Sequence, residues 1–190
     1  MKRWLIAGLG NVFKGDDAFG VEVVKRLADR AWPTQVDVVD FGINGIDLIY
    51  ALLDQYDAAV LIDTYQHAGA PGTLYVIEPE LPVAGEGLDP LDLMLNPHEL
   101  DPTKVLRMVA AMDGRCHRIV LVGCEPGDFG GEWEGRMGLT DPVVAAVDAA
   151  VSVVDSLIDE WLAGHPGTST QKSIVPGLTM AAPQRAGDAT

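Results

Sequence analysis

The chain has 190 residues, of which 13 are basic and 28 acidic, so its formal net charge at pH 7 is −15. This excess of acid argues against a nucleic-acid partner, because a protein that follows a phosphate backbone needs a basic face. It suits a partner surface or a metal ion that carries positive charge. The length and a hydrophobic content of 48% predict one soluble domain with a substantial core.

No apolar run is long enough to span a membrane, and Met1-Lys2-Arg3 leads directly into a short strand-like run. We therefore expect neither a membrane span nor a signal peptide. The two cysteines, Cys116 and Cys124, fit no zinc-binding spacing. Together these features predict a reduced, cytoplasmic protein whose thiols lie in the core.

Short apolar runs alternate with amphipathic segments along the chain. Strands are expected at 3–8, 35–40, 58–63, 72–78 and 117–124. Helices are expected at 17–31, 44–55, 101–112 and 141–163. This alternation predicts an α/β protein, a three-layer α/β/α sandwich with a mostly parallel, twisted five-stranded sheet. Only a short loop precedes the strand at 72–78, which makes it the candidate for an antiparallel strand.

Two segments lack this pattern. Residues 79–97 are rich in Pro, Gly, Asp and Glu, which predicts an irregular acidic loop. From Gly164 onward the chain has no hydrophobic periodicity, which is typical of a flexible tail. We therefore expect one α/β domain at 1–163 and a tail at 164–190.

The stretch GLGNVFKGDDAFG, residues 8–20, predicts a strand that enters a glycine turn and then a helix. Its acidic pair, Asp16 and Asp17, stands where a phosphate-binding turn would present backbone amides. The stretch begins like a dinucleotide-binding fingerprint, and Asp40 lies about where a ribose-binding acid would. However, Phe13 replaces the third glycine, and the acidic pair would repel a pyrophosphate. We therefore prefer a cation to a phosphate as the ligand of this turn.

In an open parallel sheet, ligands bind beyond the carboxyl ends of the strands. The acidic residues that follow predicted strands are Asp16, Asp17, Asp40, Asp63 and Glu125. His98 stands just before the helix expected at 101–112. Two carboxylates and this imidazole would form a mixed oxygen and nitrogen site that suits nickel, zinc or cobalt.

Each of these residues also has a structural interpretation. Asp16 or Asp17 can cap the first helix, and Asp63 can cap the turn that follows it. His98 can be a surface histidine, and His67 is a rival ligand four residues after Asp63. The chain has no G-x-S-x-G motif, and neither cysteine has an evident histidine and acid to activate it. We therefore expect no protein nucleophile.

The segment GLGNVFKGDDAFGVEVVKRL resembles the N-terminal signature of the hydrogenase maturation proteases. Three further segments resemble parts of that family in the expected order: residues 40–80, NPHELDPTKVLRMV, and VLVGCEPGDF followed by GLTDPVVAAVDAAVSVV. The resemblance runs from about residue 3 to residue 163. It implies an endopeptidase that removes a short C-terminal peptide from the large-subunit precursor of nickel-iron hydrogenase after nickel insertion.

The resemblance also implies roles for individual residues. Asp17, Asp63 and His98 would contact nickel carried by the substrate, although other divalent metals could occupy the site. Asp16 and Asp17 are then the catalytic acids, with Asp16 in a supporting or proton-handling role. The nickel, or an acid such as Asp16, would polarise or deprotonate the attacking water. The family often has glutamate where Asp17 stands, so a shorter side chain must reach the metal.

The turn Phe41-Gly42-Ile43-Asn44-Gly45 departs from the glycine-glycine-threonine-like turn of the family. The resemblance implies that this turn helps to recognise the substrate, so Gly42, Asn44 and Gly45 are expected substrate contacts. The departure leaves open which hydrogenase is processed.

Two other functions stay open. One is a non-proteolytic, nickel-sensing docking protein for hydrogenase assembly on the same scaffold. The other is a peptidyl-tRNA hydrolase-like esterase, suggested by the GLGN opening. The net charge of −15 and the lack of a histidine soon after that turn argue against the esterase.

Overall fold

The computed structural model describes residues 2–54, 56–78, 108, 109, 112, 114, 116, 118–131, 135–164, 178 and 179. The strands are β1 (Trp4–Leu9), β2 (Val36–Gly42), β3 (Ala58–Thr64), β4 (Leu74–Ile77), β5 (Arg118–Cys124) and β6 (Leu178–Thr179). The helices are the 3₁₀ turn η1 (Gly15–Ala18), α1 (Phe19–Ala28), α2 (Gly45–Asp54) and α5 (Asp141–Leu162). The helix expected at 101–112 lies mostly outside the described residues, and the loop expected at 79–97 lies wholly outside them.

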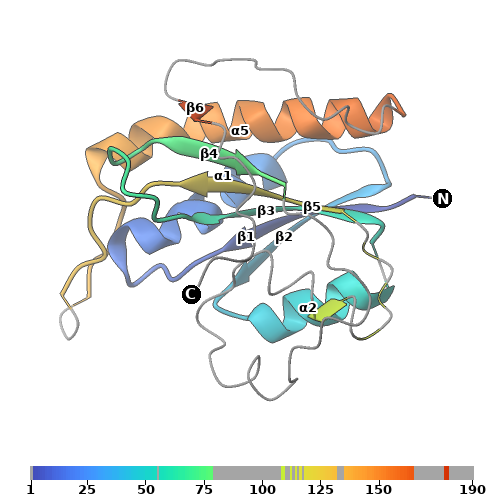
Figure 1. Cartoon of the computed structure of the whole chain (residues 1–190), viewed down its shortest axis with the longest axis horizontal. Helices are drawn as coiled ribbons and strands as arrows, with labels where there is room; N and C mark the ends of the chain where they lie inside the picture. Colours follow the sequence, from blue (N-terminus) through green and yellow to red (C-terminus); the bar gives the residue numbers. More distant parts are fainter. Residues whose placement is uncertain are drawn as a thin grey trace, which may run out of the picture.

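The strands form one twisted sheet in the order β2-β1-β3-β5-β4-β6 (Figure 1). β1 pairs in parallel with β2 and β3, and β3 pairs in parallel with β5. β4 runs antiparallel to β5. This confirms the mostly parallel sheet and the antiparallel strand expected near residues 72–78. The two-residue β6 pairs with β4 and falls within the segment expected to be a tail.

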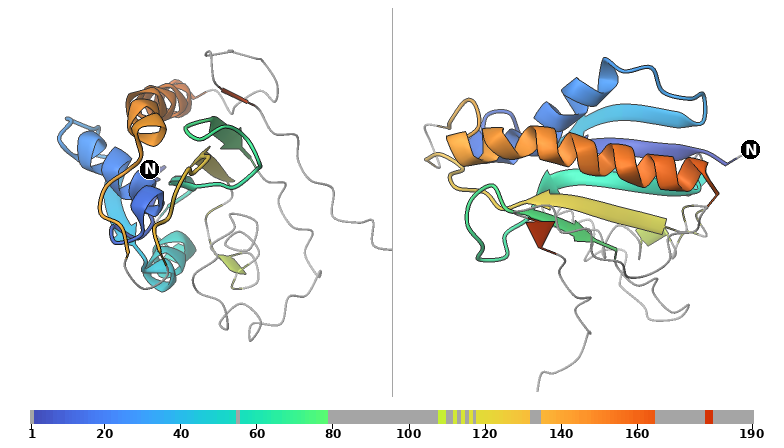
Figure 2. Two further views of the ribbon diagram at one scale, coloured as in Figure 1. Left: turned by 90° about the vertical axis from the view of Figure 1, so that its left-hand side faces the viewer. Right: turned by 90° about the horizontal axis from the view of Figure 1, so that it is seen from above.

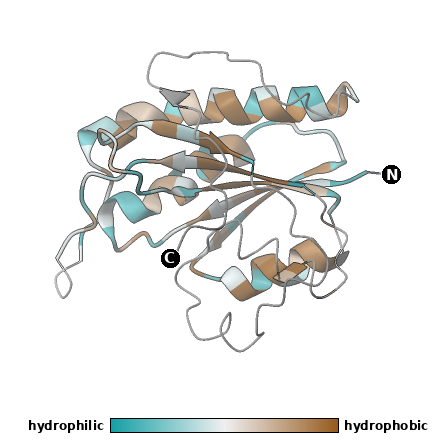
Figure 3. Ribbon diagram, viewed as in Figure 1, coloured by the Kyte–Doolittle hydropathy of each residue, from teal (hydrophilic) through white to brown (hydrophobic). Residues whose placement is uncertain are grey.

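Helices cover both faces of the sheet. α1 and α5 lie side by side on one face, and α2 lies on the other (Figures 1 and 2). Ile6 and Val60 pack towards α1 and α5, whereas their neighbours Leu5 and Leu61 pack towards α2. The central strands are therefore apolar along most of their length, because alternate side chains enter two different cores (Figure 3).

Two glycines place the start of α1 at the carboxyl ends of the central strands. A Cβ on Gly20 would lie 2.0 Å from the carbonyl oxygen of Ile62 in β3, so only glycine lets the helix approach so closely. Gly10 has φ +125°, and a Cβ there would lie 1.7 Å from the carbonyl oxygen of Asp17. The glycine turn thus brings η1, with its acidic pair, against the end of β3.

Both cysteines are free and buried, as expected from the sequence. Within the described part of the chain, we find no helix that is both long and apolar enough to cross a bilayer.

Candidate active site

Asp17 and Asp63 meet at the carboxyl ends of β1 and β3, which are neighbours in the sheet. The Thr64 hydroxyl donates a hydrogen bond to Asp17 Oδ1 (3.3 Å), and the Thr64 N–H donates to Asp63 Oδ1 (2.7 Å). Thr64 therefore joins the two carboxylates. The structure brings together two of the three predicted metal ligands, and the third, His98, lies outside the described residues.

The local environment opposes a negative charge on Asp63. Burial raises the pKa of Asp63 to about 7, from an ordinary value of 3.8, and the charge of Asp17 raises it further. The hydrogen bonds from Thr64 act in the opposite direction. A cation between the two carboxylates would offset both the cost of burying a charged Asp63 and its repulsion by Asp17.

We expect Asp63→Asn to stabilise the protein at alkaline pH. Because folding raises the pKa of Asp63, its ionisation lowers the free energy of unfolding. This destabilisation is absent near pH 4 and reaches its full size above pH 7. Asparagine keeps the acceptor for Thr64 and removes the charge. At about 1.4 kcal/mol per pKa unit, the rise from 3.8 to about 7 corresponds to roughly 4 kcal/mol, so the melting temperature should rise by about 10 °C at pH 8.5.

Differential scanning fluorimetry at pH 4.0, 7.0 and 8.5 measures this effect. Asp40→Asn is the control, because Asp40 is an exposed carboxylate at the end of β2 whose bond to the Gly42 N–H survives the change. A melting temperature of Asp63→Asn that equals wild type at pH 8.5 would contradict the predicted penalty.

Asn11 fixes the second oxygen of Asp17. The Asn11 N–H donates to Asp17 Oδ2 (3.1 Å), while the Asn11 side-chain oxygen accepts the N–H of Phe13 (2.9 Å). The asparagine of the GLGN segment thus shapes the turn and orients the carboxylate. Asn11 was not among the predicted site residues, although an asparagine inside a glycine turn is a typical turn-former.

Asp16 has a different environment from its neighbour, because it has no exposed surface. It accepts hydrogen bonds from the N–H groups of Gly127 (2.7 Å), Asp128 (2.8 Å) and Thr140 (2.6 Å), and from the Thr140 hydroxyl (2.9 Å). Burial alone would raise the pKa of Asp16, but these bonds hold it below its ordinary value. The geometry is that of an ionised anchor for two loops, and the catalytic role expected for Asp16 stays a prediction.

Thr140 occupies the N-cap position of α5, but its hydroxyl forms no cap of that helix. It donates to Asp16 instead. The start of α5 is thus bound to the turn that carries the acidic pair. Neither Thr140 nor Thr64 was singled out as a site residue, because the carboxylates that their hydroxyl groups bind lie far away in the sequence.

The turn expected to contact substrate connects β2 to α2 beside the glycine turn. The Gly10 N–H donates to the carbonyl of Gly42 (3.0 Å), which ties the two turns together. Asn44 is exposed and donates from its side chain to Asp47 (2.8 Å), whereas Gly45 is buried at the start of α2. Their role in substrate binding stays a prediction.

Glu125, which follows β5, is buried and binds groups outside the acidic pair. It accepts hydrogen bonds from the Tyr75 hydroxyl (2.7 Å) and the His67 N–H (2.8 Å). The exposed His67 ring stacks on Tyr65, with centroids 5.8 Å apart. Among the residues that the structure describes, no three His, Cys, Asp or Glu side chains form a group that could hold a metal ion.

An α/β sandwich with two neighbouring carboxylates at the carboxyl ends of parallel strands does not by itself define an activity, and comparisons with known proteins identify the class. A model of the family described as hydrogenase maturation protease matches residues 21–156. The chain belongs to this family, and it is therefore a peptide hydrolase.

Individual relatives agree with the family assignment. A putative hydrogenase maturation protease of Methanocaldococcus jannaschii is 30% identical over 156 residues, which cover 80% of this chain and 94% of the relative. The crystal structure of a hydrogenase 2 maturation peptidase from a Thaumarchaeota archaeon is 29% identical and has a TM-score of 0.62. That match covers 83% of this chain and 99% of the archaeal chain.

A structure at lower identity shows the same fold. The hydrogenase maturating endopeptidase HybD from E. coli has a TM-score of 0.64 at 24% identity, and the match covers 84% of this chain and 93% of that chain. Family membership confirms the resemblance read from the sequence. It gives no support to the non-proteolytic docking protein or to the peptidyl-tRNA hydrolase-like esterase.

Proposed function

We propose that the chain is the endopeptidase that removes the C-terminal extension of a nickel-iron hydrogenase large-subunit precursor after nickel insertion. The observation that carries this proposal is the convergence of Asp17 and Asp63, joined through Thr64, at the carboxyl ends of β1 and β3. Two oxygen donors at one sheet edge suit a divalent metal ion, and in this proposal that ion arrives as part of the substrate.

The proposed site residues have separate roles. Asp17, Asp63 and His98 contact the nickel of the precursor, which selects metal-loaded precursor and positions the scissile peptide. Bound nickel polarises the carbonyl or lowers the pKa of a water molecule. Asp17, which is only partly buried, is better placed to handle a proton than Asp16, whose oxygens already accept four hydrogen bonds.

Asp16 supports the site by fixing the turn that carries Asp17. Gly42, Asn44 and Gly45 form the proposed contact with the body of the precursor, since their turn is tied to Gly10. Two free thiols suit a reduced compartment, and we place the reaction in the cytoplasm.

The two cysteines are unsuited to nucleophilic attack, which supports a metal-directed mechanism. Burial raises the pKa of the Cys116 thiol to about 11 and that of the Cys124 thiol to about 12. A thiol with such a pKa is almost entirely protonated at neutral pH, and both side chains are buried.

The test compares nickel-loaded and nickel-free precursor. Wild-type protein should release the C-terminal peptide from the nickel-loaded form and leave the nickel-free form intact, as followed by mass spectrometry. Release of peptide from both forms at the same rate would contradict the proposal. No release from either form would favour the docking protein, and binding of RNA at low salt would favour the esterase.

The same assay tests the role of the thiols. Cys116→Ala and Cys124→Ala should keep kcat/KM within about threefold of wild type, because neither thiol takes part in the reaction. Each variant is compared at a temperature well below its melting point, since removal of a buried side chain destabilises the fold. A loss of activity confined to one folded cysteine variant would contradict the metal-directed mechanism.

A further inference from the structure

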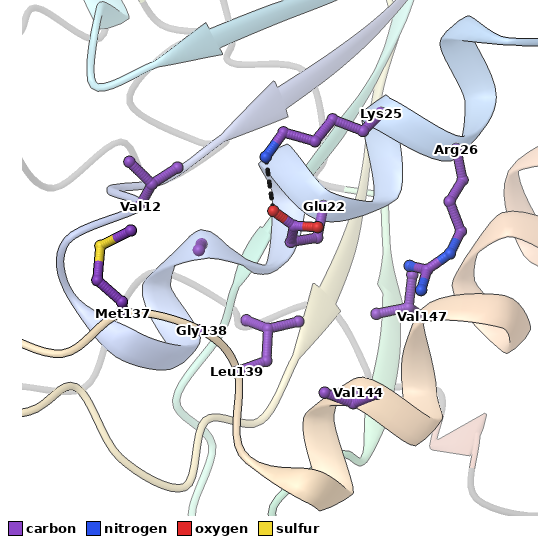
Figure 4. A pocket seen from close by; sticks show the side chains of 10 residues that line it. Val12, Glu22, Lys25, Arg26, Met137, Gly138, Leu139, Val144 and Val147 are labelled. Atoms are coloured by element: carbon purple, nitrogen blue, oxygen red, sulfur yellow. Dashed lines mark hydrogen bonds and ion pairs between the residues drawn. The ribbon is translucent and has the colours of Figure 1, made fainter.

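A pocket of about 450 Å³ lies between α1, the first turns of α5 and the loop before α5 (Figure 4). Its apolar lining consists of Val12, Ala18, Met137, Leu139, Val144 and Val147. Its polar residues are Glu22, Lys25 and Arg26, all on α1. A volume of this size accommodates a few side chains rather than the surface of a folded protein.

The pocket adjoins the candidate active site through shared loops. Ala18 directly follows Asp17, and Val12 follows Asn11, whose N–H binds the Asp17 carboxylate. Leu139 precedes Thr140, which is held by Asp16. Residues that orient the acidic edge are therefore direct sequence neighbours of residues that line the pocket.

The rim of the pocket carries several exposed apolar side chains. Met137 is 71% exposed and Val144 is 47% exposed, and Phe13 nearby is 65% exposed. The loops that carry Phe13 and Met137 are paired, because the Arg136 N–H donates to the carbonyl of Phe13 (2.9 Å). Clustered exposed apolar side chains beside a pocket mark a binding surface.

The charge of the pocket is opposite to that of the chain. Its lining carries one acid and two cations, within a protein of net charge −15. Lys25 pairs with Glu22 (2.6 Å), whereas Arg26 makes only a longer contact with Asp148 (3.6 Å). Arg26 lies beside Val147, at the end of the pocket away from Val12 and Met137 (Figure 4). An anionic group of a ligand would pair with Arg26 at that end.

The dimensions fit a short stretch of extended peptide. From Ala18 to Arg26, α1 advances about 12 Å at 1.5 Å per residue. An extended chain covers that distance with about three or four residues. A peptide that leaves the acidic edge beside Asp17 would therefore reach Arg26 within that length.

We propose that this pocket receives the segment of the precursor that follows the cut, with apolar side chains on its floor and an acidic group at Arg26. This inference rests on the proposed function and extends it to a specificity site. Residues before the cut belong to a folded subunit, which cannot enter a pocket of this size. The extension is a chain end, so it is free to bind in extended form.

The experiment measures steady-state cleavage of nickel-loaded precursor and binding of a fluorescent peptide with the sequence of the extension. Val144→Glu should raise KM and weaken peptide binding about tenfold each, with kcat near wild type, because it places a charge on the apolar rim of the pocket. Arg26→Ala should weaken peptide binding about threefold, as expected for an exposed ion pair.

Matched controls are available on the same helices. Ala145→Glu adds the same charge to an exposed position of α5 outside the pocket lining, and it should stay within twofold of wild type. Arg30→Ala removes another arginine that pairs with an α5 carboxylate, Asp155, and it should leave peptide binding unchanged. Met137→Glu gives a second test of the apolar rim if Val144→Glu folds poorly, as judged by circular dichroism.

The outcomes separate this inference from the proposed function. Cleavage by wild type with equal KM values for Val144→Glu and Ala145→Glu would overturn the pocket assignment alone. Peptide binding that Val144→Glu leaves unchanged would overturn it as well. A wild-type dimer that Val144→Glu dissociates would assign the pocket to a second copy of the chain and overturn it too. Absence of cleavage together with pocket-dependent peptide binding would overturn the proposed function only.

Discussion

Asp17→Asn and Asp63→Asn should each lower kcat/KM for nickel-loaded precursor at least about a thousandfold, equivalent to roughly 4 kcal/mol of transition-state stabilisation. Asparagine keeps the size of the side chain and an acceptor for Thr64, but it removes the negative charge that holds a cation. Because the proposed mechanism needs both charges beside the metal, neither carboxylate replaces the other. Mass spectrometry of the released peptide measures the rate.

Asp40→Asn serves as the control for this pair. Asp40 is an acid at the carboxyl end of the neighbouring strand β2, but it is exposed and its carboxylate accepts the N–H of Gly42 (2.9 Å). Its activity should stay within about threefold of wild type. Full activity in Asp17→Asn or in Asp63→Asn would contradict the proposed role of the carboxylate that the variant removes. His98→Ala extends the series, and as the proposed nitrogen ligand it should also lose most activity.

Asp16→Ala should have the largest effect on stability. Removal of the buried carboxylate leaves three backbone N–H groups and the Thr140 hydroxyl without their acceptor. Loss of one partner from a buried charged network costs about 3–5 kcal/mol, so the melting temperature should fall by roughly 10 °C. Asp16→Asn should be almost as unstable, because its amide group would face donors.

The pH dependence of this loss follows from the lowered pKa of Asp16. A group with a lowered folded-state pKa stabilises the fold above its ordinary pKa of 3.8 and loses that contribution as the pH falls further. The gap between wild type and Asp16→Ala should therefore be full at pH 7 and shrink below pH 3.8. Urea denaturation across this range measures it.

Asp128→Asn is the matched control for Asp16. Asp128 lies in the same loop region, but its carboxylate is exposed and pairs with Arg136 and the Gly130 N–H. Its replacement should leave the melting temperature within about 2 °C of wild type. Equal destabilisation by Asp16→Ala and Asp128→Asn would contradict the role of Asp16 as the anchor.

Local patterns were sufficient to predict most of the fold. The continuous apolar runs at 58–63 and 117–124 correspond to β3 and β5, since both faces of the central sheet are covered. The helix expected at 17–31 begins instead as η1 at Gly15–Ala18 and becomes α1 at Phe19. β6 has two residues and a partner about a hundred residues away, so no local pattern could reveal it.

The candidate site was predicted only in part, because local patterns show which acids follow strands but not which distant groups they contact. The strand-end rule and the family resemblance selected Asp17 and Asp63, because both follow strands that share an edge. The strand-end rule alone could not separate Asp16 from Asp17, to which only the resemblance gave different roles. The two residues are adjacent in sequence but differ completely in environment. Asp16 is distinguished by partners 111 to 124 residues away, and such contacts leave no local signature.

These distant partners also determine when the acidic edge can form during synthesis. A nascent chain carries Asp17 and Asp63 once its first 64 residues have emerged, but Thr140 is made much later. Closing a loop of 124 residues comes late in folding, since its entropy cost precedes any gain from contacts. The anchoring of the acidic turn thus awaits near-complete synthesis of the domain. A ribosome-bound fragment would therefore hold the acids without the anchor that orders them.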